Sequence, residues 1–126
     1  MLLDTNVFIW ASREPGHLSP EAKLAITDPF NERFVSMASV WEMQIQHGLG
    51  KLPLAANVVE LSQKWLSPLN ARILPVELQH LDRLYSLPAI HRDPFDKIMI
   101  AQALVEGMKI VSSDSGFHGY AAQIVW

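Results

Sequence analysis

The fold class of this chain follows from residues 93–114, which read DPFDKIMIAQALVEGMKIVSSD. Asp93 followed by proline is typical of a helix start, because Asp caps the first turn and proline has the backbone angle that the first position needs. Apolar residues then continue as far as Gly107, a usual helix end. The sequence predicts a helix over residues 94–106 that leads into a strand over residues 109–112.

The same alternation runs through the rest of the chain. Short apolar runs typical of strands occur in four further places, at residues 1–4, 33–37, 72–76 and 121–125. Between them lie stretches with helical signals, at residues 7–13, 20–28, 39 to 48 or 50, 57–66 and 77–85, with a turn or short helix at 115–120. Alternating strands and helices require crossovers, which produce a mainly parallel sheet covered on both faces. We therefore predict one three-layer α/β domain over residues 1–126.

Composition limits the class of protein. Hydrophobic residues make up 49% of the chain and charged residues 18%, which permits a packed core and argues against global disorder. The absence of cysteine excludes a disulfide scaffold and thiolate zinc sites, and the five histidines show no zinc-ligand spacing. No apolar run or signal-peptide pattern suggests a membrane, so we expect a cytoplasmic protein. The net charge of −3 argues against stable, non-specific nucleic-acid binding, but permits an enzyme that contacts phosphate through a cation.

Four acidic residues fall where predicted strands end and predicted helices begin. Asp4 closes the first strand, and Asp114 lies two residues after the strand at 109–112. Glu42 and Asp96 each lie in the first turn of a predicted helix. Because ligands of open parallel sheets bind beyond the carboxyl ends of the strands, we expect all four side chains to project from the same edge.

Each acid also has a purely structural interpretation. Asp4 would serve as the cap of the next helix, and Glu42 would complete a capping box that begins at Ser39. Asp96 would interact only with the helix dipole, and Asp114 would belong to an ordinary turn. These interpretations stay open when the residues are considered one at a time.

Together, the four acids indicate a metal site. Two carboxylates about 4 Å apart repel by roughly 4 kcal/mol at an effective dielectric constant of about 20, and no Lys or Arg is clearly placed among them. Mg²⁺ or Mn²⁺ would remove this repulsion, because hard divalent cations prefer oxygen ligands. Such an ion can polarise a phosphoryl oxygen and generate hydroxide from water. The cluster therefore predicts metal-assisted hydrolysis of phosphodiester bonds.

Four short motifs also resemble those of a known family. They are LLDTN at residues 2–6, SVWE at 39–42, HRDPFDK at 91–97 and VSSD at 111–114. In this order they look like the successive motifs of PIN-domain proteins, especially the VapC-type toxins of prokaryotic toxin–antitoxin pairs. The resemblance covers nearly the whole chain. It implies a five-stranded parallel sheet, Mg²⁺- or Mn²⁺-dependent endoribonuclease activity, and inhibition by a cognate antitoxin protein.

The resemblance also implies roles for individual residues. The family's acidic positions fall on Asp4, Glu42, Asp96 and Asp114, and positions where a polar residue commonly assists the site fall on Asn6 and Ser112. Position 6 is often His in similar proteins, and Gln46 occupies a position that is often Lys. These two departures affect substrate positioning and remove one candidate phosphate contact.

Residues beside Asp96 are candidates for contact with RNA. His91, Arg92 and Lys97 flank this acid and would suit the RNA backbone, although the two cations would also suit solvated surface positions. Asp93 is a supporting residue, and the proline after it favours a helix cap over a metal ligand.

The chain is rich in apolar residues for its size, with four tryptophans. A sheet buried on both faces accounts for most of them. The remainder suggests an exposed surface for an antitoxin helix or for self-association, and hence a homodimer. The candidates for this surface are Phe8, Trp10, Trp41, Ile45, Leu49 and Leu52.

Two other functions fit parts of the pattern. A Mg²⁺-dependent phosphatase or phosphoacceptor domain also places Asp at strand ends, but the phosphatase pattern needs a second Asp two residues after the first, where this chain has Asn6. A non-catalytic binding module on the same scaffold is the other alternative, and the presence of all four acids argues against it.

Overall fold

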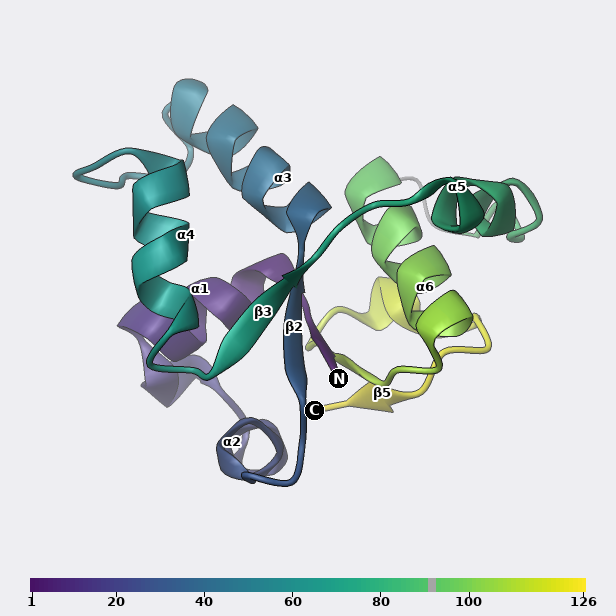
Figure 1. Ribbon diagram of the computed structural model, residues 1–126, viewed down its shortest axis with the longest axis horizontal. Helices are drawn as coiled ribbons and strands as arrows, with labels where there is room; N and C mark the ends of the chain where they lie inside the picture. The colour runs from purple at the N-terminus through teal and green to yellow at the C-terminus, as the bar shows by residue number, and fades with distance from the viewer. Residues whose placement is uncertain (91–92) are drawn as a thin grey trace.

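Five short strands form one sheet at the centre of the protein, in the order β3-β2-β1-β4-β5, and every neighbouring pair is parallel (Figure 1). The structure is a computed structural model that describes residues 1–90 and 93–126. The strands are β1 Leu2–Leu3, β2 Arg33–Ser36, β3 Ala71–Leu74, β4 Ile110–Val111 and β5 Ile124–Val125. All five predicted strands are present, each shorter than expected. The prediction of a parallel α/β sheet is confirmed.

Helices cover both faces of this sheet, with α1, α2 and α4 on one side and α5 and α6 on the other (Figure 1). The α-helices are α1 Thr5–Arg13, α2 Pro20–Thr27, α3 Met37–Gly48, α4 Val58–Leu66, α5 Leu78–Tyr85 and α6 Pro94–Glu106. Two 3-10 turns, η1 Pro15–His17 and η2 Ser115–Phe117, complete the described elements. Of these elements, η1 was not predicted. None of the helices in the described part of the chain is long and apolar enough to cross a membrane.

Successive strand residues face opposite layers, as the pleat of a strand requires. Leu3 and Val111 pack into the core beneath α1, α2 and α4, whereas Leu2 and Ile110 pack against α6. All four are fully buried. The apolar runs in the sequence therefore reflect burial on both faces rather than on one.

The strongest sequence prediction, the helix α6, is confirmed at both ends. The Asp93 carboxylate accepts a hydrogen bond from the Phe95 amide at 2.9 Å and caps the first turn. Gly107 ends the helix in the left-handed conformation, with φ 65°, which a residue without a Cβ adopts readily. Asp93 is therefore a helix cap, as predicted.

The start of α3 differs from the prediction. Ser36, at the end of β2, caps this helix by accepting a hydrogen bond from the Ala38 amide at 3.0 Å. Ser39 is therefore inside the helix and fully buried, and the predicted capping box between Ser39 and Glu42 is wrong. Glu42 consequently lies in the second turn of α3, not in the first.

The predicted apolar surface is correct only in part. Phe8 is fully buried in the core, so its assignment to the surface was wrong: it packs edge-on against Trp65 of α4. Trp10 and Leu52 are partly buried against the same core. The exposed members lie on α3 and at its C-cap, with exposures of 61% for Trp41, 40% for Ile45 and 65% for Leu49.

Candidate active site

Asp4 lies where β1 becomes α1, and its carboxylate is held from two sides. One oxygen, Oδ1, accepts a hydrogen bond from the Thr5 amide at 2.7 Å, so Asp4 does cap α1 and the helix begins two residues earlier than predicted. The other, Oδ2, accepts a hydrogen bond from the Ser112 hydroxyl at 2.8 Å. Burial raises the pKa of Asp4, the two hydrogen bonds oppose this rise, and the charges of Asp114 and Asp93 add to it.

Ser112 connects the first acid to the last. Its fully buried hydroxyl donates to Asp4 and accepts a hydrogen bond from the Asp114 amide at 3.0 Å. The Asp114 side chain is exposed and accepts a hydrogen bond from the Gly116 amide at 2.8 Å, so it caps the short helix η2. The supporting position predicted for Ser112 therefore lies in contact with the acidic edge.

Glu42 extends from α3 into the same region. One of its carboxylate oxygens, Oε1, is buried and has no hydrogen-bond partner among the described residues. Burial raises the pKa of Glu42, the nearby polar side chain of Thr5 opposes the rise, and the charges of Asp93 and Asp4 add to it. An unsatisfied buried carboxylate oxygen is costly, so it favours either a proton or a cation at this position.

Among the predicted acids, Asp96 has the most strongly raised pKa. It is buried in the first turn of α6, as predicted, and its pKa is raised to about 8. Burial is the largest cause, followed by the charges of Asp93, Asp4, Glu42 and Asp114. The other three predicted ligands thus each raise the pKa of Asp96, although the four acids come from separate parts of the sequence.

The donor set is chemically suited to a hard divalent cation. The four acids supply only oxygen, and the buried Oε1 of Glu42 leaves one oxygen without a protein partner. As the side chains stand, however, no three acidic or histidine groups within residues 1–90 and 93–126 are close enough together to hold one ion. The oxygen ligands suit a divalent cation by their chemistry. To bind one, the carboxylates would have to turn toward each other.

The other predicted residues are distributed around this edge. Asn6 is exposed in the first turn of α1, and Lys97 is partly buried on α6 beside Asp96. His91 and Arg92 lie outside the described residues. Sequence reasoning missed Thr5, whose hydroxyl interacts with Glu42. The signal in the sequence that could have identified Thr5 as a site residue is its position directly after Asp4.

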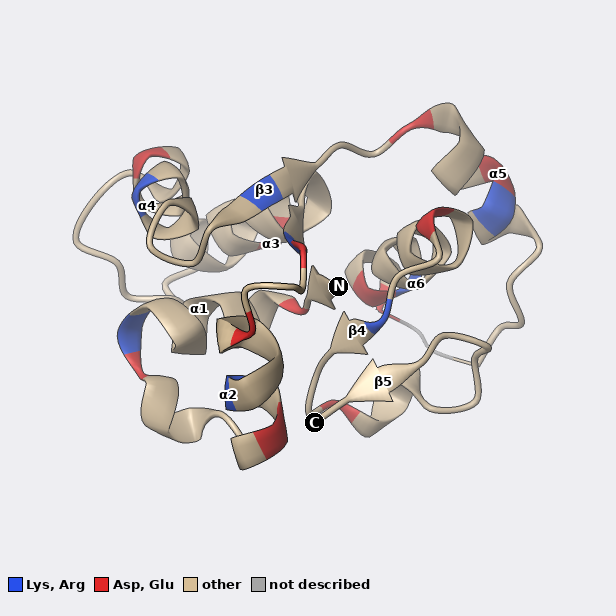
Figure 2. Ribbon diagram, turned by 60° about the horizontal axis from the view of Figure 1, so that its bottom comes forward, with Lys and Arg blue, Asp and Glu red and all other residues tan. Residues whose placement is uncertain are grey.

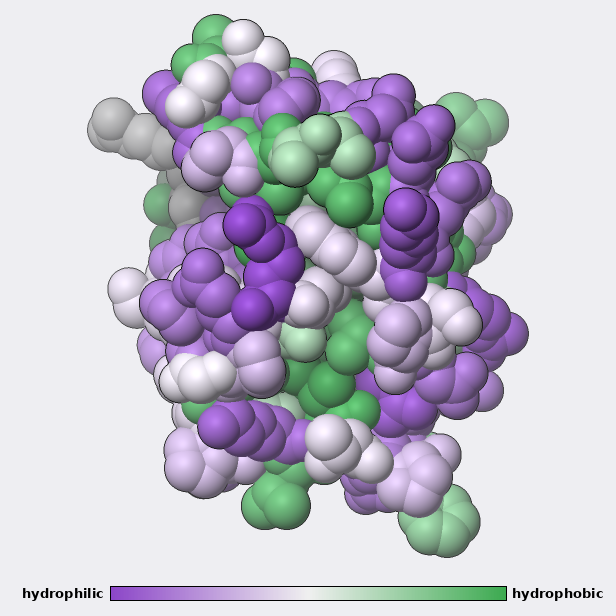
Figure 3. Space-filling model, turned by 90° about the vertical axis from the view of Figure 1, so that its left-hand side faces the viewer, coloured by the Kyte–Doolittle hydropathy of each residue, from purple (hydrophilic) through white to green (hydrophobic). Residues whose placement is uncertain are grey.

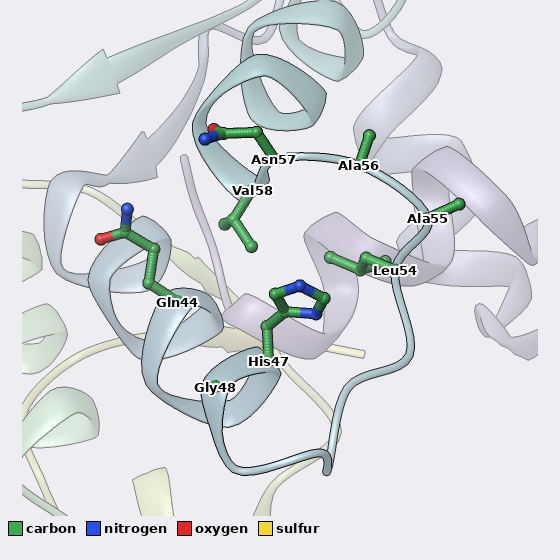
Figure 4. Close-up of a pocket in the computed structure, with 8 residues that line it drawn as sticks. All are labelled: Gln44, His47, Gly48, Leu54, Ala55, Ala56, Asn57 and Val58. Carbon is green, nitrogen blue, oxygen red and sulfur yellow. The ribbon is translucent and has the colours of Figure 1, made fainter.

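Basic residues are not concentrated beside the acids. Among the described residues, Lys and Arg positions are dispersed over separate elements and form no single stripe (Figure 2). A pocket of about 390 Å³ elsewhere on the molecule lies between the end of α3 and the start of α4 (Figure 4). There His47 Nδ1 is 2.9 Å from the Leu52 carbonyl oxygen, and no acidic residue lines the pocket. The acidic edge is therefore the stronger candidate for chemistry.

Comparisons with known proteins agree with this fold. The sequence model of the PIN domain matches residues 1–123. Among solved structures, VapBC2 from Rickettsia felis has a TM-score of 0.68 at 16% identity, covering 98% of this chain and 95% of that chain. DNA-bound VapBC from Salmonella typhimurium has a TM-score of 0.69 at 16% identity, covering 98% and 94%. FitAcB from Neisseria gonorrhoeae has a TM-score of 0.63 at 20% identity, covering 98% and 94%. No individually curated protein matches the chain.

Proposed function

The chain belongs to the PIN-domain family, and we propose that it is a metal-dependent endoribonuclease, the toxin component of a type II toxin–antitoxin pair. The observation that carries this proposal is the buried carboxyl group of Asp96, whose pKa is raised to about 8, first by burial and then by the charges of four other acids. A structural helix cap needs one acid and not five. PIN domains are generally nucleases, and the solved structures that share the fold are toxin–antitoxin complexes.

Asp4, Glu42, Asp96 and Asp114 would hold Mg²⁺ or Mn²⁺ in this proposal. A bound cation would supply a polarised phosphoryl oxygen and a hydroxide nucleophile. Ser112 fixes one Asp4 oxygen by donating a hydrogen bond at 2.8 Å, which orients the carboxylate toward the edge.

Substrate contacts in this proposal come from residues around the acids. Asn6 is exposed in the first turn of α1, two residues after Asp4, and would donate hydrogen bonds from its side-chain amide to the RNA. His91, Arg92 and Lys97 are proposed to contact the phosphate backbone. Because described basic residues are dispersed (Figure 2), affinity for RNA would depend mainly on the bound cation. We expect weak RNA binding without metal.

Two apolar stripes support the proposal of protein partners. Four apolar residues recur every four positions along α3 and at its C-cap: Met37, Trp41, Ile45 and Leu49 are 51%, 61%, 40% and 65% exposed. On α5, Leu78, Leu81 and Tyr85 are 83%, 46% and 94% exposed. A hollow of about 560 Å³ lies between these helices and α6. The face that carries α1 and α4, by contrast, alternates hydrophilic and hydrophobic patches (Figure 3).

We assign this α3–α5 surface to a homodimer contact or to a cognate antitoxin segment. Both occupants would bury an apolar area that is otherwise exposed to water. A similar solved structure, from Klebsiella pneumoniae, is a toxin–antitoxin complex, which supports a protein partner. Leu81→Glu introduces a charge into the hollow, so it should weaken self-association in light scattering, with Leu24→Glu on α2 as the exposed control.

An RNA cleavage assay tests the nuclease proposal. Purified protein should cut a single-stranded RNA in Mg²⁺ or Mn²⁺ and stop in excess EDTA. Asp4→Asn and Glu42→Gln should each lower the rate roughly a hundredfold or more. Glu60→Gln, at an exposed position on α4, is the matched control and should cleave as the wild type does.

The two alternative functions give different results in the same experiment. A binding module on the PIN scaffold would take up Mn²⁺ or RNA without cleavage. A phosphatase or phosphoacceptor domain would release phosphate from a small phosphate ester and leave the RNA intact. Cleavage that persists in EDTA, or in the Asp4→Asn protein, would contradict the metal mechanism.

A further inference from the structure

Three buried side chains beneath the acidic edge are joined by hydrogen bonds across different elements. The Thr5 hydroxyl on α1 donates to the Ser39 hydroxyl on α3 at 2.9 Å. The Ser39 hydroxyl in turn donates to the Met99 sulfur on α6 at 3.4 Å. Thr5 is 4% exposed, and the other two side chains are fully buried. The contacts therefore form a chain from α1 through α3 to α6, out of reach of solvent.

Each member of this chain lies next to one of the acids. Thr5 directly follows Asp4. Residues three apart in a helix share a face, so Ser39 lies one turn before Glu42. By the same spacing, Met99 lies one turn after Asp96. These hydrogen bonds thus connect the three backbone segments that carry the three most buried of the four predicted ligands.

The hydrogen bonds of Ser39 differ from those of other helical hydroxyls in the protein. Ser12, Thr27 and Ser62 each donate to the carbonyl oxygen four residues earlier, at 2.8, 2.7 and 2.8 Å. This is the usual partner of a hydroxyl inside a helix. Ser39 instead bonds to side chains of two other helices. Its hydroxyl therefore contributes to the arrangement of helices and not to the helix in which it lies.

We propose that Thr5, Ser39 and Met99 are positioning residues: they keep the segments of Asp4, Glu42 and Asp96 close enough for the three carboxylates to turn onto one divalent cation. This inference rests on the proposed function. Apolar packing is non-directional, whereas a hydrogen bond fixes both a distance and an angle. Repulsion among the carboxylates would move their segments apart in the absence of metal, and the buried chain opposes that movement.

Ser112 makes a second set of contacts, separate from the Thr5–Ser39–Met99 hydrogen bonds. Ser112 links Asp4 to the segment of Asp114. The Thr5–Ser39–Met99 chain links Asp4 to the segments of the remaining two acids. The two sets of contacts together link the segment of Asp4 to the segments of the other three predicted acids.

The test measures Mn²⁺ binding to the full-length protein by calorimetry, together with the melting temperature of the metal-free protein. Thr5→Val keeps the shape of the side chain and removes the hydroxyl, whereas Thr5→Ser keeps the hydroxyl. Ser39→Ala removes the central hydroxyl, and Met99→Leu removes the sulfur at nearly constant volume. Ser62→Ala removes a buried hydroxyl of α4 and serves as the matched control.

We expect Thr5→Val and Ser39→Ala to weaken Mn²⁺ binding roughly tenfold to a hundredfold, the usual effect of removing a contact behind a ligand. Met99→Leu should weaken it less, because sulfur is a poor acceptor. Thr5→Ser should restore most of the affinity. Ser62→Ala should lower the melting temperature about as much as Ser39→Ala does, and leave Mn²⁺ affinity unchanged.

Different results separate this inference from the proposed function. If the wild type binds Mn²⁺ with the same affinity as the Thr5→Val and Ser39→Ala proteins, that result would overturn the positioning role alone. The same conclusion follows if Thr5→Ser binds as weakly as Thr5→Val. A wild type that binds no Mn²⁺ would overturn the proposed function and the positioning role with it. RNA cleavage that recovers at saturating Mn²⁺ in Ser39→Ala would support the inference.

Discussion

Replacing Asp96 by Asn should make the metal-free protein more stable at neutral pH, although the change lies in a buried position. The pKa of this carboxyl group is raised from 3.8 to about 8, first by burial and then by the neighbouring acids. The folded protein therefore binds more protons than the unfolded chain between these two values. The stability contributed by Asp96 is fully present below about pH 4 and is lost as pH rises through about 8. Asn resembles the protonated acid and avoids this loss.

The size of the gain follows from the shift. At pH 7 the pKa difference would correspond to about 4 kcal/mol, because one pKa unit corresponds to 1.36 kcal/mol. Solvent at the open edge screens the charges and reduces the expected gain to about 1–3 kcal/mol. Each remaining kcal/mol should raise the melting temperature by roughly 3–5 °C in a domain of this size.

Thermal melts of the two proteins in EDTA, at pH 5 and at pH 7.5, measure this effect. Asp96→Asn should melt higher at pH 7.5, and the difference should shrink at pH 5. Asp82→Asn, an exposed site on α5, controls for the general loss of a negative charge. Added Mn²⁺ should raise the wild-type melting temperature by mass action and that of Asp96→Asn much less. A lower melting temperature for Asp96→Asn in EDTA, with a full Mn²⁺ shift, would refute this reasoning and leave Asp96 a helix-terminal residue.

Two further changes test the contacts beneath the site by urea denaturation. Ser112→Ala removes a buried hydroxyl that makes two hydrogen bonds, so it should lower the free energy of unfolding by about 1–3 kcal/mol. The exposed neighbour Ser113→Ala should change it by less than about 0.5 kcal/mol. Gln102→Leu leaves the Ser36 hydroxyl and two backbone carbonyls without their side-chain partner, and should cost about 2–4 kcal/mol, whereas Gln63→Leu on the exposed face of α4 should cost little. Equal stabilities within either pair would show that the buried contacts contribute nothing.

The sequence predicted those parts of the fold that depend on local signals. The Asp93 cap and Gly107 define the ends of α6 whatever surrounds them, and both predicted ends are correct. The start of α3 depends instead on where β2 stops, because Ser36 and Ser39 both suit a cap position. Ser39 with Glu42 imitates a capping box, and only the register of β2 in the sheet selects Ser36.

The acidic edge was predictable because topology alone brings the ends of parallel strands together. The catalytic and metal-binding roles of Asp4, Glu42, Asp96 and Asp114 stay predictions. The buried contacts around them were not predictable, since they depend on how three helices pack. Ser39 and Met99 are separated by sixty residues, and their hydrogen bond forms only when α3 lies against α6. Phe8 was misassigned for a similar reason, because its burial depends on the position of α4.

Crystals grown with Mn²⁺ would show whether these four acids bind a divalent cation. An anomalous difference map locates the metal without reference to activity. We expect a peak within about 2.5 Å of carboxylate oxygens from Asp4 and Asp96, with Glu42 Oε1 turned toward it directly or through water. A peak elsewhere on the protein, or no peak at this edge at saturating Mn²⁺, would show that the acids do not form a metal site.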